Sequence, residues 1–152
     1  MSIKIIAIGK KHESWVSQGI ERYEKRLTKT FQPAWNIIPH SSREGIAARH
    51  EESQRIILRL KPDEYVVLLD ETGTSLDSPT LSRKLDSVMT SGKSIVFIIG
   101  GAYGVDASVH DRADLTWSLS PLVFPHQLVR LILAEQLYRA QEIRAGHPYH
   151  HA

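Results

Sequence analysis

The alternation of apolar and polar stretches along the chain predicts strands that alternate with helices. Five short runs are almost continuously apolar or β-branched, which is typical of strands buried on both faces of a sheet. They span residues 3–9, 34–39, 65–70, 94–101 and 115–120. The run "SIVFIIGG" at residues 94–101 is the strongest of them.

Between these runs, apolar side chains recur every three or four positions, as they do in helices. The first helix is expected from about Glu13 to Leu27. The others are a helix that begins within residues 40–54 and ends at Leu60, one opened by Ser78 and Pro79, a short one from about Asp106 and a long one from about Gln127 to Ala145. The segment "ETGTSLDSP" at residues 71–79 is expected to be a turn-rich loop.

A strand and a helix repeated about five times predict one α/β domain over residues 1–152, with a mostly parallel sheet and helices on both faces. Ligands of such sheets bind beyond the carboxyl ends of the strands. Three of these ends carry distinctive loops, which are "LLDETG", "IIGGAYG" at residues 98–104 and "SLSPLVFPHQ" at residues 118–127.

The last predicted helix has apolar residues around most of its circumference, whereas a surface helix needs only one apolar stripe. These residues are Leu128, Val129, Leu131, Ile132, Leu133, Ala134, Leu137, Tyr138, Ala140 and Ile143. The helix is therefore central to the core, or its second face meets another subunit. In a domain this small, a symmetric homodimer is the favoured interpretation.

Charge and composition narrow the class of protein. The net charge of +2, from 19 basic and 17 acidic residues, does not by itself argue for a nucleic-acid partner. Arg22, Arg26 and Lys29 share a face at helical spacing, which fits a solvated face as well as a surface that contacts phosphates. The absence of cysteine, of a long apolar run and of a signal-peptide pattern leads us to expect a cytoplasmic protein.

Several chemistries are excluded by missing motifs. The glycines near residue 101 lack the dinucleotide spacing, and no Walker Gly-Lys-Ser/Thr is present. They indicate either a plain tight turn or a bare backbone against which a ligand lies. No Gly-x-Ser-x-Gly or His-Glu-x-x-His occurs. His147 and His150 could chelate a metal, but no Cys, Asp or Glu in the tail would complete the site, so we expect none.

Three stretches together resemble the RlmH (YbeA) family of SPOUT-class methyltransferases, which act on N3 of a pseudouridine in 23S rRNA. They are "IKIIAIGKKHESWVSQGIERYEKRL", "IIGGAYGVD" and "WSLSPLVFPHQLVRLILAEQLYRAQEIRAGHPYHH". The resemblance covers essentially the whole chain, and the C-terminal stretch is its most specific part. It implies a trefoil knot in the C-terminal half, a homodimer, S-adenosylmethionine as methyl donor and 23S rRNA within the ribosome as substrate.

The resemblance also implies where the site lies. It assigns the cofactor to Leu69, Gly101, Ser120, Pro121, Leu122, Val123, Phe124 and Pro125. Backbone and apolar residues of this kind suit adenine and a sulfonium that needs no dedicated carboxylate. His150 is the candidate general base or orienting group, Tyr149 the candidate to stack on or hydrogen-bond the uracil, and Arg139 a further catalytic candidate.

Contacts with RNA are expected from Arg22, Arg26 and Arg130, although ion pairing within the protein explains the arginines of the last helix as well. His151 stands where the family usually has a basic residue, which leaves a phosphate contact there open. Two other functions remain as alternatives. One is a SPOUT enzyme that acts on tRNA, and the other is a catalytically silent RNA-binding protein.

Overall fold

The computed structural model describes residues 1–149 and contains one five-stranded sheet. Its strands are β1 (Ile3–Ile8), β2 (Pro33–Ile38), β3 (Tyr65–Ser75), β4 (Ile95–Ile99) and β5 (Leu115–Ser118). The sheet order is β2-β1-β4-β3-β5, and all four neighbouring pairs are parallel. The predicted α/β fold is therefore confirmed.

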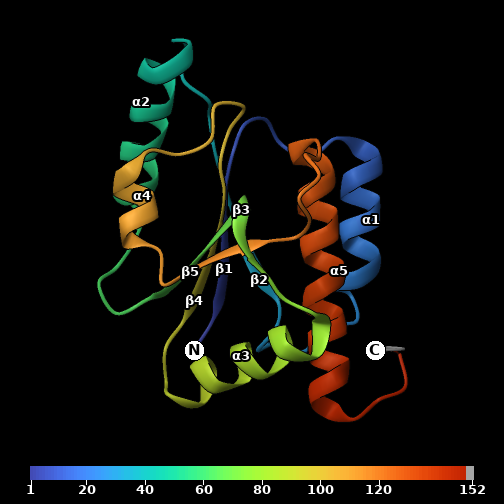
Figure 1. Cartoon of the computed structure of the whole chain (residues 1–152). Helices are drawn as coiled ribbons and strands as arrows, with labels where there is room; N and C mark the ends of the chain where they lie inside the picture. The colour runs from blue at the N-terminus through green and yellow to red at the C-terminus, as the bar shows by residue number, and fades with distance from the viewer. Residues whose placement is uncertain (150–152) are drawn as a thin grey trace.

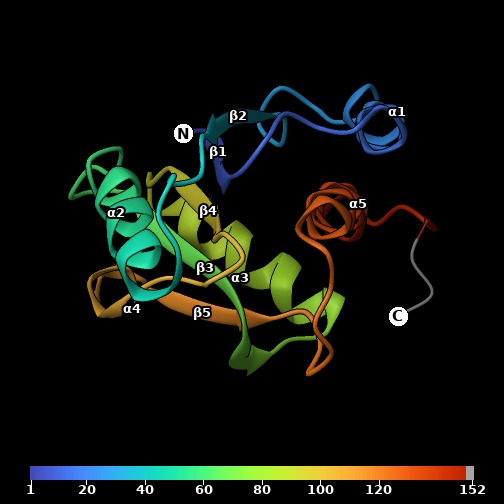
Figure 2. The ribbon, with the colours of Figure 1, turned by 90° about the horizontal axis from the view of Figure 1, so that it is seen from above.

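Helices cover both faces of this sheet, as predicted (Figures 1 and 2). They are α1 (Ser14–Glu24), α2 (Gly45–Ile57), α3 (Ser78–Thr90), α4 (Ala107–Arg112) and α5 (His126–Ala145). One face packs on α3 and α5 through Leu81, Leu133 and Leu137, and the other on α2 and α4 through Ile56 and Val109. Helix α1 packs against α5 rather than directly over the centre of the sheet.

Strand β4 is the centre of the fold, as its sequence predicts. All five of its residues are buried, because β1 and β3 pair with it on either side and helices cover both faces. Its odd-numbered residues, Ile95, Phe97 and Ile99, face the α3–α5 side, while Val96 and Ile98 face α2 and α4. This alternation explains why the strand is apolar at every position.

One prediction about the backbone was wrong, because residues 71–75 belong to β3 rather than to a loop. Both Leu69 and Thr74 are opposite Trp117 of β5, so the extra residues bulge out of the ladder before the pairing resumes. Gly73 lies in this bulge, where a β-carbon would be only 2.5 Å from the carbonyl oxygen of Thr116. The turn-like composition of the segment reflects the bulge, not the end of the strand.

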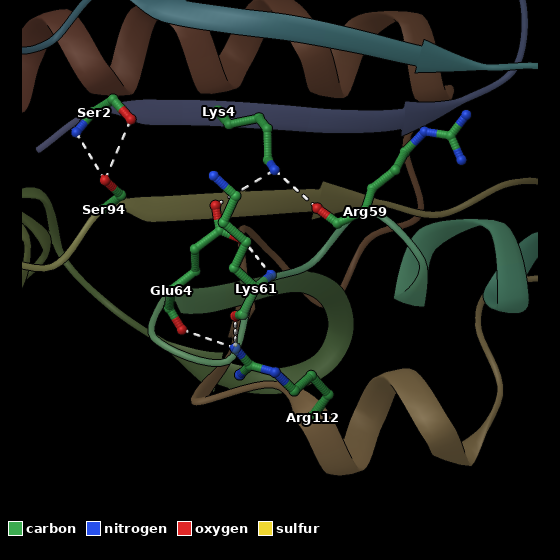
Figure 3. Close-up of polar contacts among 7 residues, drawn as sticks. All are labelled: Ser2, Lys4, Arg59, Lys61, Glu64, Ser94 and Arg112. Atoms are coloured by element: carbon green, nitrogen blue, oxygen red, sulfur yellow. Dashed lines mark hydrogen bonds and ion pairs between the residues drawn. The ribbon is translucent and has the colours of Figure 1, made fainter.

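A polar network fixes the amino-terminal edge of the sheet, away from the carboxyl ends of the strands (Figure 3). The ammonium of Lys4 on β1 donates to the carbonyl of Arg59 at 2.9 Å and pairs with Glu64 at 3.4 Å. Arg112 at the end of α4 donates to the carbonyls of Lys61 and Glu64, each at 2.9 Å. The α2–β3 loop is thus held from two sides.

One finding and one open prediction concern the described residues as a whole. No helix within residues 1–149 is long and apolar enough to span a bilayer. The trefoil knot implied by the family resemblance stays a prediction.

Two glycine substitutions should separate a steric conflict with backbone from one with a flexible side chain. Gly73→Ala places its methyl group against the Thr116 backbone and should lower the free energy of unfolding by about 2 kcal/mol. Gly19→Ala on α1 meets only the Leu131 side chain, and its gain in helix propensity of about 1 kcal/mol offsets that contact. Urea denaturation of both variants checks the difference, and equal destabilisation would contradict the described bulge.

Candidate functional site

The three strand-end loops singled out in the sequence meet in one cleft at the carboxyl edge of the sheet. The cleft is lined by residues from the ends of β3 and β4, the loop after β5 and the start of α5, including Leu69, Gly101, Ser120, Phe124 and Val129. The empty space between these residues measures about 810 Å³ when the open solvent at its mouth is included.

A tight turn from Gly101 to Gly104 forms one wall of the cleft. The backbone N–H of Gly104 donates to the carbonyl of Gly101 at 3.0 Å, and Gly104 has a φ of +73°, which favours glycine. Gly100, Gly101, Ala102 and Gly104 all line the cleft, so backbone atoms make up most of this wall. The tight turn is therefore confirmed and leaves bare backbone along the cleft, while a ligand lying against that backbone stays a prediction.

The side of Gly101 turned towards α2 has a different neighbour. A β-carbon on Gly101 would lie 2.7 Å from Oε1 of Glu52 and 3.0 Å from Cγ2 of Ile8. Glu52 is 3% exposed, and its other oxygen, Oε2, accepts from the backbone N–H of Ser41 at 2.9 Å. Glycine is thus required at position 101 to make room for a buried carboxylate.

Helix α2 also anchors the far end of the glycine turn. The hydroxyl of the buried Ser53 accepts from the backbone N–H of Asp106 at 3.0 Å. Asp106 caps α4 by accepting from the N–H of Ser108 at 3.0 Å, so its carboxylate occupies the position that a phosphate would take.

The loop after β5 forms the opposite wall. Ser120 shapes it, since its hydroxyl accepts from the N–H of Leu122 at 3.0 Å and its carbonyl accepts from the hydroxyl of Ser118 at 3.0 Å. Six of the eight residues predicted for the cofactor line the cleft, namely Leu69, Gly101, Ser120, Leu122, Val123 and Phe124. Pro121 and Pro125 belong to the same loop but do not line it.

The cleft contains carboxylates that the sequence analysis did not assign to it. Asp70 and Glu71, directly after Leu69 on β3, line the cleft together with the apolar residues. Asp70 is fixed by the N–H and hydroxyl of Thr72, at 2.8 and 2.6 Å. The expectation of a purely backbone and apolar site was therefore wrong, because the strand continues past Leu69 and carries these side chains along the edge of the cleft.

His126, the first residue of α5, also lines the cleft. Burial lowers its pKa below the ordinary value of 6.5, and the positive charge of Arg130 lowers it further, against the opposing effect of Glu52 and Glu71. The imidazole is therefore mainly neutral at pH 7. It presents a donor and an acceptor to the cleft without adding a positive charge.

The described part of the tail folds back on α5. The hydroxyl of Tyr149 donates to Oε2 of Glu135 at 3.1 Å, and its ring packs 4.7 Å from that of Tyr138. Arg139 pairs with Glu135 at 3.0 Å and lies 4.9 Å from the centre of the Tyr149 ring. Burial and the charge of Glu135 raise the pKa of Tyr149 to about 12, so its hydroxyl is a hydrogen-bond donor, not a base, at pH 7.

Tyr149 and Arg139 do not lie at the cleft of their own chain. Glu135 and Arg139 follow His126 by nine and thirteen positions on α5, which at 1.5 Å per residue is about 14–20 Å along the helix axis. Figure 1 shows the C-terminal end of α5 at the opposite end of the molecule from the loops around the cleft. His150, the candidate base, lies outside the described residues.

His147 contacts the last turns of α5. Its Nδ1 contacts a carboxylate oxygen of Glu142, and its backbone N–H donates to the Glu142 carbonyl at 2.9 Å. Gly146 ends α5 with a φ of +74°, as predicted. Among residues 1–149, no three His, Cys, Asp or Glu side chains come together to hold a metal ion.

The three arginines expected at RNA differ in placement. Arg22 and Arg26 are exposed at the surface of the α1 segment. Arg130 is only 1% exposed, and its guanidinium donates to the carbonyl of Lys10 at 2.8 Å. The prediction of a surface contact for Arg130 does not fit this placement, because its position on α5 faces the end of β1. Arg130 instead fixes the turn after β1.

Sequence reasoning missed Glu52, Asp70, Glu71 and His126. Asp70 and Glu71 stand in the quoted "LLDETG" loop, and His126 in "SLSPLVFPHQ", so their placement could have been inferred from the strand ends. Glu52 gave no such signal, because it lies within a charged helical stretch that resembles a solvated face.

The lowered pKa of His126 predicts that the fold loses stability in mild acid. Below about pH 6.5 the unfolded chain takes up a proton at this residue that the folded chain binds less readily, so protonation favours unfolding. Between about pH 7.5 and 5.5, the melting temperature of His126→Gln should therefore fall less than that of the wild type. The exposed His40→Gln is the control, and identical pH curves for wild type and His126→Gln would contradict the prediction.

Comparison with known proteins identifies the family to which the chain belongs. A family model described as "Predicted SPOUT methyltransferase" matches residues 1–150. Proteins named "Ribosomal RNA large subunit methyltransferase H" are similar along almost their whole length: those of Desulfitobacterium hafniense, 41% identical over 158 residues, and Acetivibrio thermocellus, 42% identical over 158 residues, each with 99% of both chains covered. That of Thioalkalivibrio sulfidiphilus is 43% identical over 154 residues, again with 99% of both chains covered. The chain therefore belongs to the SPOUT methyltransferase family.

Proposed function

We propose that this methyltransferase transfers a methyl group from S-adenosylmethionine to N3 of a pseudouridine in large-subunit (23S) ribosomal RNA, on the assembled ribosome. The relatives named above support a ribosomal RNA substrate. The observation that carries the proposal for this chain is the cleft, where three strand ends and the start of α5 surround an open hollow lined by backbone, apolar and acidic groups.

The residues of the cleft fit S-adenosylmethionine, which supplies an activated methyl group on a positively charged sulfur. The backbone of the glycine turn offers hydrogen-bonding groups without side chains in the way. Leu122 and Phe124 on the other wall offer apolar surface for a planar base. Asp70 and Glu71 at the edge suit a cationic ligand, since opposite charges attract strongly where water is partly excluded.

The chain's main contribution to the reaction is to hold donor and acceptor in line. The proton on N3 of the acceptor must also leave, and a general base assists that step. We assign His150 to this role or to orienting the base. Tyr149, which stays protonated far above neutral pH, can donate its one hydroxyl hydrogen to a uracil carbonyl in exchange for Glu135 but does not accept the proton.

A homodimer is part of the proposal. Leu128 and Ile132 remain half-exposed on α5, although the opposite side of the helix is buried. They line a groove with Gly19 and Tyr23 of α1, and Ile132 also borders a second hollow beside the start of α3. An apolar stripe of this kind on a long helix is typical of a surface that packs on its own copy.

Antiparallel packing of the two α5 helices would bring the separated parts of the site together. In such a twofold arrangement, the C-terminal end of one α5 lies beside the N-terminal end of the other. The tail of one protomer, with Tyr149 and Arg139, would then reach the cleft of its partner. We therefore propose that the tail acts across the dimer, which accounts for its distance from the cleft of its own chain.

RNA binding is assigned to the exposed basic residues of the α1 segment. Arg22 and Arg26 form no ion pair with the residues described, so their charges are available to phosphates. Arg22 also borders the groove between α1 and α5, close to the proposed dimer face. A shared surface across two protomers would compensate for the small net charge of +2 per chain.

A methyl-transfer assay tests the substrate assignment. The wild-type chain with radiolabelled S-adenosylmethionine should label 23S rRNA in ribosomes that lack the modification, and the label should map to N3 of one pseudouridine. Free large subunits and tRNA are the comparison substrates. Label found only in tRNA would contradict the proposal, and calorimetry without binding of S-adenosylmethionine would exclude the enzyme altogether.

Mixed dimers test whether the tail works across the interface. Ala102→Trp fills the cleft from an exposed lining residue, and deletion of residues 149–152 removes the tail, so each homodimer should be inactive. If the tail serves the partner's cleft, mixing the two chains rebuilds one complete site per mixed dimer, and about a quarter of the wild-type activity should return.

An inactive mixture of the two variants would contradict action of the tail across the dimer. If the tail serves its own cleft, no mixed dimer contains a complete site, and the mixture should stay inactive. Light scattering on each variant provides the control that both still dimerise, and a monomeric wild type at micromolar concentration would contradict the proposed interface.

A further inference from the structure

The feature that carries a further inference is the buried carboxylate behind the glycine turn. Oε1 of Glu52 has no hydrogen-bond partner among the described residues, although the residue is only 3% exposed. Oε2 has a single partner, the backbone N–H of Ser41. Buried polar groups are normally satisfied, and leaving a carboxylate oxygen unpaired in the interior is costly. Glutamine has the same shape without the cost of burying a charge. The presence of glutamate at this position therefore indicates that its negative charge is used.

The position of Glu52 gives its charge access to the cleft. Its Oε1 lies 2.7 Å from the point where a β-carbon of Gly101 would be, and Gly101 itself lines the cleft. Only backbone therefore separates the carboxylate from the ligand space. Because this layer excludes water, the charge is screened far less than a charge on the surface.

The surrounding charges do not cancel this field. Asp70 and Glu71, which also line the cleft, have the same sign as Glu52. His126 on the other side is mainly neutral at pH 7, because burial and Arg130 lower its pKa more than Glu52 and Glu71 raise it. The guanidinium of the buried Arg130 donates to the carbonyl of Lys10, and Arg55, one turn along α2 from Glu52, pairs with Glu51 instead.

We infer that Glu52 is a specificity-determining residue, whose negative charge makes the cleft bind the cationic donor S-adenosylmethionine more tightly than the product S-adenosylhomocysteine. The inference rests on the proposed function. Donor and product share the adenosine and amino-acid groups and differ only in the methyl group and the positive charge on sulfur. Loss of that charge on methyl transfer weakens the attraction of Glu52, so the spent product leaves more readily.

Glu52→Gln isolates the charge. Glutamine has the same shape and keeps an oxygen that accepts from the N–H of Ser41. Calorimetry should show S-adenosylmethionine binding to the variant about tenfold more weakly than to the wild type, since a charge behind a layer of backbone is only partly screened. The affinity for S-adenosylhomocysteine should stay within about twofold of the wild type, since that ligand lacks the sulfonium charge.

The neighbouring Glu51→Gln is the matched control. Glu51 is on the same helix, is one-third exposed and pairs with Arg55 at 2.6 Å on the surface. Its removal should leave the ratio of the two affinities unchanged. An equal loss of both ligands in Glu52→Gln would overturn the inference, because it would show a structural role for Glu52 without charge discrimination.

A measurement on the wild-type chain keeps the inference testable even if the variant does not fold. Raising KCl from about 0.1 to about 1 M shortens the Debye length to about 3 Å, which screens the more exposed carboxylates of the cleft but not a buried one. The preference for the cationic donor should persist. Its collapse would assign the preference to the surface charges and overturn the inference, as would the absence of any preference.

The same titrations separate this inference from the proposed function. A wild-type chain that binds neither ligand contradicts the proposed function itself. A wild-type chain that binds both with the same affinity leaves the methyltransferase assignment standing and removes only the role of Glu52.

Discussion

The parallel sheet, covered by helices on both faces, is the constraint on which the rest of the structure depends. Parallel strands need a crossover after each strand, so the loops that follow β3, β4 and β5 all begin at one edge. Their backbone groups have no further strand to pair with, and they are available to a ligand there. The opposite edge is sealed by the Lys4, Glu64 and Arg112 network, so the two edges of the sheet have different uses.

The features of the fold that depend on burial could be predicted from the sequence. Continuous apolar runs located all five strands. Helix α5 is buried on one side and half-exposed on the other, and the homodimer favoured from its two-sided pattern stays a prediction. The bulge in β3 could not be predicted, because Gly73 and its neighbours have the composition of a turn. Only the pairing of Thr74 with Trp117, a contact between distant segments, shows that the strand continues.

The residues of the candidate site also fall into those that could be placed from the sequence and those that could not. Residues close to a strand end, such as Leu69, Gly101 and Ser120, lie at the cleft because the strand itself determines their position, and their contact with the cofactor stays a prediction. Arg130 was misplaced because its neighbours on α5 allow either an exposed or a buried position, and contact with the turn after β1 decides between them. Glu52 was missed for the same reason, since its partner Gly101 lies on another element far along the chain.

Helix α5 connects these conclusions and also sets the limit of what one protomer can do. It begins at the cleft with His126 and ends at the tail, so its length of twenty residues, about 30 Å, separates the two groups of residues on which the proposed reaction depends. No rearrangement of a short tail spans that distance while Tyr149 stays packed between Tyr138 and Arg139. Within one protomer the two ends of α5 cannot meet. Pairing with an antiparallel copy would place the C-terminal end of one α5 beside the N-terminal end of the other. In the proposed dimer, the half-exposed Leu128 and Ile132 would have a structural role, because the surface that would join the two protomers would also complete each site.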